Sequence, residues 1–165
     1  MKFRRFGLAA GAAAMLTLGA QAANAAGLFA NMAGSWRGEG WVTWSTGETE
    51  ILRCTATYEV EDEGNKIEQN LTCATDTTKL IVKSTISFRP AAGAIVGTWS
   101  ETTYGVNGRV SGSASQGRIQ ALVQSGDKKF TARVAVITRG EEQTVTISPQ
   151  EIELAEVSVT LKKTG

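Results

Sequence analysis

The chain has 165 residues, no histidine, two cysteines and a formal net charge of +1, and these values exclude several classes of protein. Without histidine there is no Ser-His-Asp or Cys-His catalysis and no imidazole metal site, and two cysteines are too few for a thiolate zinc site. The near-neutral charge argues against a nucleic-acid binder, which would carry a basic excess. With 42% hydrophobic and 20% charged residues, the composition indicates one globular domain.

Residues 1–25 have the pattern of a secretory signal peptide. A basic start with Arg4 and Arg5 precedes an apolar run over 6–18, which is too short for a transmembrane segment, and 23–25 (Ala-Asn-Ala) offers a cleavage site. We therefore expect export, to the periplasm of a Gram-negative bacterium or, alternatively, into the medium.

Cleavage after residue 25 would leave a single β-barrel domain over 26–165. It would remove three of the 17 basic residues and none of the 16 acidic ones, so the mature net charge would be −2.

The domain is predicted to be all-β. Successive segments alternate apolar with polar side chains and are bounded by turn residues, which is typical of half-buried antiparallel strands. A helical turn is expected near 28–32 and a hairpin turn at Asn107-Gly108. An antiparallel up-and-down barrel of about 8–10 strands would hide both sheet edges, and a two-sheet sandwich is the alternative. The predicted strands are 35–44, 49–60, 66–74, 78–89, 94–103, 109–115, 118–125, 129–139, 143–149 and 152–162.

The two cysteines fall in one predicted hairpin. Folding 49–74 about Glu63-Gly64 pairs Val60 with Ile67, Tyr58 with Gln69, Ala56 with Leu71 and Cys54 with Cys73. Hydrophobic phase and cysteine position select the same register, and opposed Cβ atoms lie about 4.5–5.5 Å apart. We predict a Cys54–Cys73 disulfide, which export would favour; two reduced thiols are the alternative.

The sequence offers little reactive chemistry. It contains no recognisable nucleophile–base set and no paired carboxylates, so we expect a protein that is not an enzyme and uses no cofactor or metal. Glu101 shares a phase with Trp99. It is either an inward carboxylate for a ligand amine or an arginine, or a rim-exposed residue near the strand end. Gly38 and Gly40 are interpreted as glycines at which a strand bends in a closing barrel.

Three tryptophans crowd the first predicted strand. Trp36 and Trp44 share one face, whereas Trp41 points to the other. Core packing accounts for Trp36. An outward indole on a barrel is costly without a partner, so Trp41 is a candidate contact for a surface partner.

The segment Gly34-Ser35-Trp36 resembles the Gly-x-Trp that opens the first strand of lipocalin-like, or calycin, barrels, and Gly97-Thr98-Trp99 is similar to it. In those families the tryptophan closes the barrel bottom beneath a ligand cavity. A later arginine packs on it, a role that the resemblance would give to Arg133 or Arg139.

Two further resemblances concern exported proteins. The surroundings of Cys54, Cys73 and 97–102 look like small exported Gram-negative proteins without an assigned activity. The size, single disulfide and early Gly-x-Trp are also similar to secreted metalloprotease-inhibitor barrels. That resemblance would make 26–33 an inhibitory segment.

Two hypotheses for function follow. In the first, a non-enzymatic barrel in the cell envelope binds a small apolar or amphipathic ligand, and the candidate lining residues are Trp36, Tyr58, Gln69, Leu71, Ser84, Trp99 and Glu101. In the second, side chains fill the barrel, which acts through its surface as a protease inhibitor or an envelope-integrity protein with an envelope protein as partner. Space inside the barrel distinguishes the two.

Overall fold

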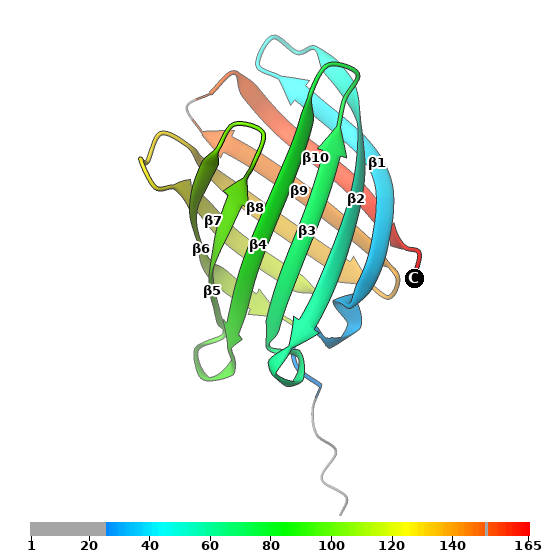
Figure 1. Cartoon of the computed structure of the whole chain (residues 1–165), viewed down its shortest axis with the longest axis vertical. Coiled ribbons are helices and arrows are strands. Elements are labelled where there is room, and N and C mark those ends of the chain that lie inside the picture. The colour runs from blue at the N-terminus through cyan, green and yellow to red at the C-terminus, as the bar shows by residue number, and fades with distance from the viewer. Residues whose placement is uncertain (1–25, 151) are drawn as a thin grey trace, which may run out of the picture.

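A computed structural model describes residues 26–150 and 152–165, and the predicted signal peptide lies outside them. The described chain forms a closed barrel of ten strands with three short 3-10 turns (Figure 1). The turns are η1 (Ala30–Met32), η2 (Asp62–Gly64) and η3 (Pro90–Ala92). The strands are β1 (Gly34–Trp44), β2 (Thr49–Glu61), β3 (Lys66–Ala74), β4 (Lys79–Arg89), β5 (Ala94–Glu101), β6 (Val106–Ser115), β7 (Arg118–Ser125), β8 (Thr131–Arg139), β9 (Glu142–Gln150) and β10 (Leu154–Lys163).

Each strand pairs antiparallel with its neighbours in sequence, and β1 pairs with β10 to close the barrel. The up-and-down barrel is thus confirmed, and the sandwich is excluded. One expected turn is wrong, because Asn107 and Gly108 lie within β6. The chain turns earlier, over 102–105, where Glu101 accepts backbone N–H groups of the loop and Gly105 has a φ of +68°.

We call the end of the barrel that carries η1 the closed end, because the segment over 26–33 covers it (Figure 1). Phe29 and Met32 are buried there. The amide of Phe29 donates to the carbonyl oxygen of Gly64 over 2.8 Å, and the indole Nε1 of Trp36 donates to that of Met32 over 2.8 Å. The expected helical turn is η1, and it packs as part of the core.

Glycines allow β1 to lie very close to β10. A Cβ on Gly38 would overlap the carbonyl oxygen of Thr160, and one on Gly40 would overlap that of Ser158. These two glycines therefore serve the close approach of two backbones at the closure of the barrel.

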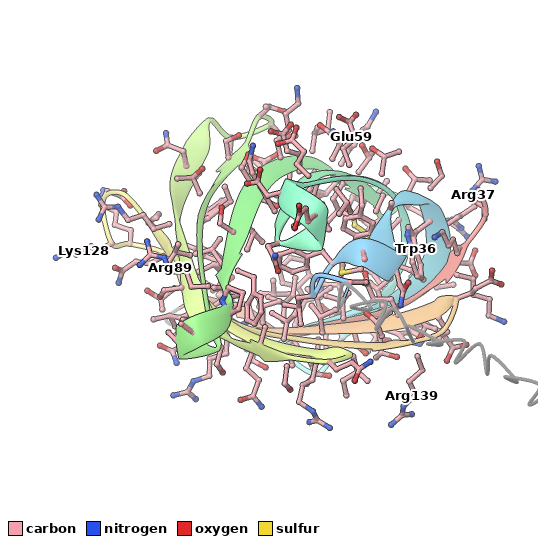
Figure 2. All side chains as sticks on the ribbon, turned by 90° about the horizontal axis from the view of Figure 1, so that it is seen from below. Trp36, Arg37, Glu59, Arg89, Lys128 and Arg139 are labelled. Carbon is pink, nitrogen blue, oxygen red and sulfur yellow. A yellow bond between two sulfur atoms is a disulfide. The ribbon has the colours of Figure 1, made fainter. Side chains whose placement is uncertain are left out.

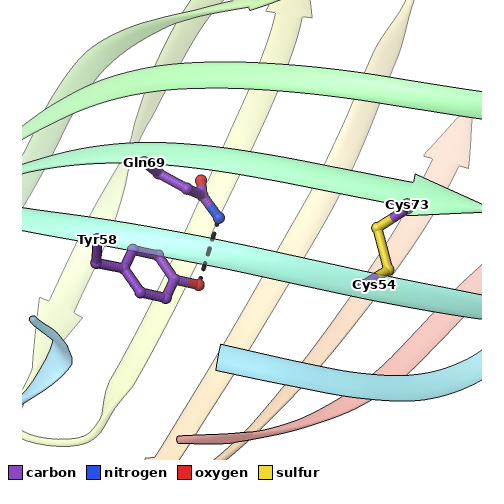
Figure 3. The surroundings of a disulfide bond; sticks show 4 residues. All are labelled: Cys54, Tyr58, Gln69 and Cys73. Atoms are coloured by element: carbon purple, nitrogen blue, oxygen red, sulfur yellow. Dashed lines mark hydrogen bonds between the residues drawn. A yellow bond between two sulfur atoms is a disulfide. The ribbon is translucent and has the colours of Figure 1, made fainter. Parts of the chain in front are cut away.

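The predicted disulfide is present inside the barrel (Figure 3). Cys54 and Cys73 are register partners whose Cα atoms are 4.1 Å apart, and both are buried. Ala56 pairs with Leu71 as expected. The register predicted from the alternation of apolar residues and from the cysteine positions is therefore confirmed.

Candidate ligand-binding site

Four of the candidate lining residues lie side by side on the inner face of the barrel. Register pairs join Tyr58 of β2 to Gln69 of β3, Gln69 to Ser84 of β4, and Ser84 to Trp99 of β5. Directly paired residues point to the same face of a sheet, and this face carries the buried residues of β2. We call these four residues the inner row.

Hydrogen bonds connect the inner row to the opposite wall. Ser84 Oγ donates to Gln69 Oε1 (2.8 Å), and Gln69 Nε2 donates to Tyr58 Oη (3.3 Å; Figure 3). Tyr58 Oη donates to Gln143 Oε1 (2.7 Å), and Gln143 Nε2 donates to Thr138 Oγ1 (3.2 Å). We call this chain of five side chains the polar bridge.

Gln143 is a residue that the sequence analysis missed. It is fully buried, and both ends of its amide are hydrogen-bonded. The available signal was its position, because Gln143 is a polar residue in the same phase as the apolar Val145 and Ile147. A buried polar side chain in an apolar phase needs a partner.

The side chains of the polar bridge are uncharged. Burial raises the pKa of Tyr58 to about 12, and the hydrogen bonds with Gln69 and Gln143 only partly oppose that rise. Tyr58 therefore keeps its proton at neutral pH and remains a hydrogen-bond donor.

A recess of about 490 Å³ lies along β3 to β6; we call it the row recess. Seven of its eleven lining residues point to the outer face of the sheet (Glu68, Asn70, Lys83, Thr85, Thr98, Ser100 and Asn107), and the other four are Gln69, Ser84 and Trp99 of the inner row and Gly108 of β6. The row recess therefore opens on the outside of the barrel, behind the inner row. Its volume falls within the range of small-molecule sites, about 300–1,000 Å³.

The indole nitrogen of Trp99 is buried and has no hydrogen-bond partner in the described part of the chain. The ring packs edge-on against Phe130, with centroids 5.8 Å apart. A Cβ on Gly108 would stand 2.8 Å from the indole nitrogen. A buried donor without an acceptor costs about 1–3 kcal/mol. An acceptor that reached the indole nitrogen of Trp99 would remove that cost.

The inner wall is unevenly packed. Inward residues of β1, β2 and β10 such as Trp36, Ala56 and Leu161 are buried. On β7 to β9, several inward apolar side chains keep partial exposure: Ile119, Ala121, Val123, Val134, Val136, Val145 and Ile147. Because these side chains point into a closed barrel, their exposure indicates space in the lumen on that side.

Trp36 belongs to the core, and a lysine packs on it. Its ring lies edge-on to Tyr58 at 6.2 Å, and Lys163 Nζ stands 5.8 Å above it. The expectation that Arg133 or Arg139 fills this position is wrong, because both are exposed; Figure 2 shows Arg139 pointing away from the barrel. Lys163 is brought to Trp36 by the pairing of β1 with β10.

Leu71 and Glu101 lie outside the inner row. Leu71 is an inward, partly buried residue that pairs with Ala56 and Val82. Glu101 is buried, so the expectation of a rim-exposed residue is wrong. Its carboxylate accepts the backbone N–H groups of Tyr104 (2.7 Å), Thr103 (2.7 Å) and Ile81 (3.2 Å).

Those N–H groups explain the ionisation of Glu101. Burial alone would raise the pKa of Glu101, but the donors from Tyr104, Thr103 and Ile81 outweigh it and hold the pKa below its ordinary value. Among the described residues, no basic side chain forms an ion pair with it. Glu101 thus fixes the β5–β6 loop.

Trp41 points outward, as predicted, and is 55% exposed. Its register partner on β2 is Ile51, which is 44% exposed. We call these two residues the outer pair.

In residues 26–150 and 152–165, no group of His, Cys, Asp or Glu side chains is placed to hold a metal. The same residues include no helix with the length and hydropathy to cross a membrane.

Neither a protein-family model nor a curated protein sequence matches the chain. Its structure is similar to that of the S-type phycobiliprotein lyase CPES from Guillardia theta, with a TM-score of 0.59 and 8% identity, over 83% of this chain and 90% of that chain. The chain has a lipocalin-like fold. At this identity the similarity concerns the fold alone.

In this lipocalin-like barrel, Trp36 of the Gly-x-Trp segment lies at the closed end, as the resemblance implied. The segment over 26–33, which the metalloprotease-inhibitor resemblance would make an inhibitory segment, is held in the fold. Phe29 is 1% exposed, and the amide of Gly27 donates to the carbonyl oxygen of Glu63 over 3.0 Å. Phe29 is thus a core residue at the closed end.

Proposed function

We propose that this protein is an exported, non-enzymatic lipocalin-like barrel that binds a small amphipathic ligand at the inner row. The observation that carries the proposal is the inner wall, where the buried indole N–H of Trp99 lacks an acceptor among the described residues and inward apolar side chains of β7 to β9 keep partial exposure. Export, with the periplasm of a Gram-negative bacterium as destination, is supported by the pattern of residues 1–25 and by the disulfide.

The distribution of polar groups supports an amphipathic ligand. Ser84 Oγ–H and one N–H of Gln69 are used on the bridge, whereas the indole N–H of Trp99 has no acceptor among the described residues. The wall formed by β7 to β9 offers partly exposed apolar side chains such as Val123 and Val134. A carbonyl or carboxylate oxygen on an apolar body fits this combination.

Trp99 has to move when a ligand binds. Its nitrogen is covered, so the indole turns about its side-chain bonds before an oxygen can reach the N–H. Ligand binding then gains a hydrogen bond that the free protein lacks, and this gain offsets part of the cost of the movement.

A titration with dodecanoate, methyl dodecanoate and dodecanol tests the proposal. We expect at least one of them to raise the Tm of the exported protein and to shift the indole N–H signal of Trp99 in NMR spectra. Trp99→Phe keeps a ring but removes the donor, and should weaken binding about five- to tenfold. Trp41→Phe, the matched change on the outer face, should leave binding unchanged. No change in Tm or in the Trp99 signal with any probe would contradict the proposal.

A second candidate function, contact with an envelope protein, is favoured by the outer pair. Trp41 and Ile51 present adjoining apolar side chains on the outer face, and such exposed pairs mark interaction surfaces. A photo-crosslinking amino acid at position 41 should give a protein adduct in the envelope, whereas one at the exposed position 133 of β8 should not. Equal adducts, or none, would count against this function.

A further inference from the structure

A second recess, of about 510 Å³, opens at the closed end; we call it the end recess. It lies between the η1 segment and the turns that join β6 to β7 and β8 to β9. Leu28, Met32 and Ile119 supply apolar lining. The charged residues in its lining are Arg118, Lys163 and Glu141.

The two cations of the end recess have no acidic partner. Within the described residues, no carboxylate oxygen lies within 4.0 Å of the Arg118 guanidinium or the Lys163 ammonium. Lys163 Nζ is held by neutral groups, since it donates to the carbonyl oxygen of Asn31 over 3.3 Å and lies above the Trp36 ring. An ammonium has three donors, so Lys163 retains donors for an anion.

The end recess is distinct from the row recess. Gln69 and Ser84 line the row recess, and Thr138 lines the end recess. The polar bridge joins these residues across the barrel. The inner row and the end recess have different tryptophans nearby: Trp99 belongs to the inner row, and Trp36 donates a hydrogen bond to the carbonyl oxygen of Met32, which lines the end recess.

We propose that the end recess binds the acid group of an anionic amphiphile, with Arg118 and Lys163 as its contacts and Leu28, Met32 and Ile119 against its apolar part. The lining of the end recess carries two cationic side chains and one carboxylate, so its net positive charge favours a bound anion. A guanidinium can hold the carboxylate of such a ligand through paired N–H groups. A small inorganic anion would leave the apolar lining unused, and a neutral amphiphile would leave the cations unused. This site does not depend on the ligand proposed for the inner row.

Indole N–H signals from ¹⁵N-labelled exported protein test the site. The probes are dodecanoate, dodecanol and acetate, each below its micelle concentration. Dodecanoate should shift the Trp36 signal with an affinity at least fivefold above that of dodecanol or acetate. Trp41→Phe, Trp44→Phe and Trp99→Phe each remove one indole signal, which leaves the Trp36 signal assigned by elimination.

Two variants and a control test the contacts. Arg118→Gln and Lys163→Gln should each weaken dodecanoate binding about three- to fivefold, because a partly exposed ion pair contributes up to about 1 kcal/mol, and should leave dodecanol binding unchanged. Arg139→Gln removes a neighbouring exposed cation that does not line the recess and should have no effect. Arg118 is exposed, so the Arg118→Gln variant should fold normally even if Lys163→Gln disturbs the contact with Trp36.

The outcomes separate the two proposals. Equal affinity for dodecanol and dodecanoate at the Trp36 signal, or unchanged dodecanoate binding in both variants, would overturn the anion site. A dodecanoate shift confined to Trp99 would also overturn it while supporting the function proposed for the inner row. A shift confined to Trp36 that depends on Arg118 would support the anion site and count against the function proposed for the inner row.

Discussion

Tyr58 of β2 donates its phenolic hydrogen bond to the amide oxygen of Gln143 on β9, 2.7 Å away. β2 and β9 are separated in the sheet by β1 and β10, so this bond crosses the lumen. Both residues are buried, and Trp36 packs edge-on against the Tyr58 ring. Side chains as well as backbone pairing therefore connect the two walls of the barrel at this point.

Tyr58→Phe should destabilise the protein. The change keeps the ring but leaves Gln143 Oε1 without its donor and Gln69 Nε2 without its acceptor. Each buried polar group left unpaired costs about 1–3 kcal/mol, so the free energy of unfolding should fall by about 2 kcal/mol in urea titrations. Tyr104→Phe, at a position that is 67% exposed, should change it by less than about 0.5 kcal/mol. Equal stability of the two variants would show that the bridge contributes nothing.

The stability of the wild type should fall at high pH because of the same residue. The pKa of Tyr58 is about 12 in the folded protein against 10.0 for the free side chain. The folded state therefore holds its proton more tightly, and the stabilisation is complete below pH 10 and is lost as the pH rises from 10 to 12. Two pKa units correspond to about 2.7 kcal/mol.

Absorbance near 295 nm can follow this ionisation directly. Tyr58 is the single tyrosine left in Tyr104→Phe, since the chain has two tyrosines. We expect its titration in the folded protein to be centred near pH 12, and Tyr58→Phe to lose less stability than wild type between pH 10 and 12. A midpoint near 10 in protein that is still folded would contradict the burial of the phenol.

Removal of the disulfide should cost about 3 kcal/mol, since the bond closes a loop between residues 19 apart. The double variant Cys54→Ala with Cys73→Ala should unfold at lower urea concentration than wild type. Dithiothreitol should destabilise the wild type and leave the double variant unchanged. If reductant destabilises both proteins equally, the effect does not arise from this bond.

The strands and the disulfide register could be predicted because both depend on local alternation. The phase of 49–74 pairs Cys54 with Cys73 by counting along two adjacent strands, and the same counting places Tyr58 beside Gln69. Side chains that share a phase on consecutive strands must fall on one face of a meander. The inner row is a consequence of that geometry.

Contacts across the lumen could not be predicted in this way. The partner of Tyr58 is Gln143, 85 residues away, and Lys163 reaches Trp36 because the last strand closes on the first. Such contacts depend on strand number, tilt and side-chain length together. The role of Glu101 was missed for a local reason. Its carboxylate accepts backbone N–H groups of the β5–β6 loop, and the position of that loop was predicted incorrectly.

Phe29→Ala should destabilise the closed end. Phe29 is 1% exposed and packs in the core with Met32 and Trp36, and loss of a buried phenyl ring costs about 3–5 kcal/mol. Leu28→Ala, at a partly buried neighbour, should cost clearly less. Thermal unfolding of both variants measures the difference. A Tm for Phe29→Ala equal to that of wild type would show that the segment over 26–33 does not help to hold the barrel together.

Glu101→Gln should remove an acid-sensitive contribution to stability. The folded-state pKa of Glu101 is lowered, so its stabilising effect is present above the pKa of the unfolded chain, about 4.3, and is lost as the pH falls through the folded-state value. At pH 7 the glutamine variant should be less stable by about 1–3 kcal/mol, because charge-assisted bonds to the loop N–H groups are replaced by neutral ones.

The difference between wild type and Glu101→Gln should therefore shrink as the pH falls below about 4.3. Urea unfolding at pH 7, 5, 4 and 3 measures it. Glu59→Gln changes a carboxylate on the outer face of β2, which Figure 2 shows at the periphery of the barrel, and should leave the curve parallel to that of wild type. A constant difference between wild type and Glu101→Gln at all four pH values would mean that the amide reproduces the contacts of the ionised carboxylate, and that the charge of Glu101 does not hold the loop.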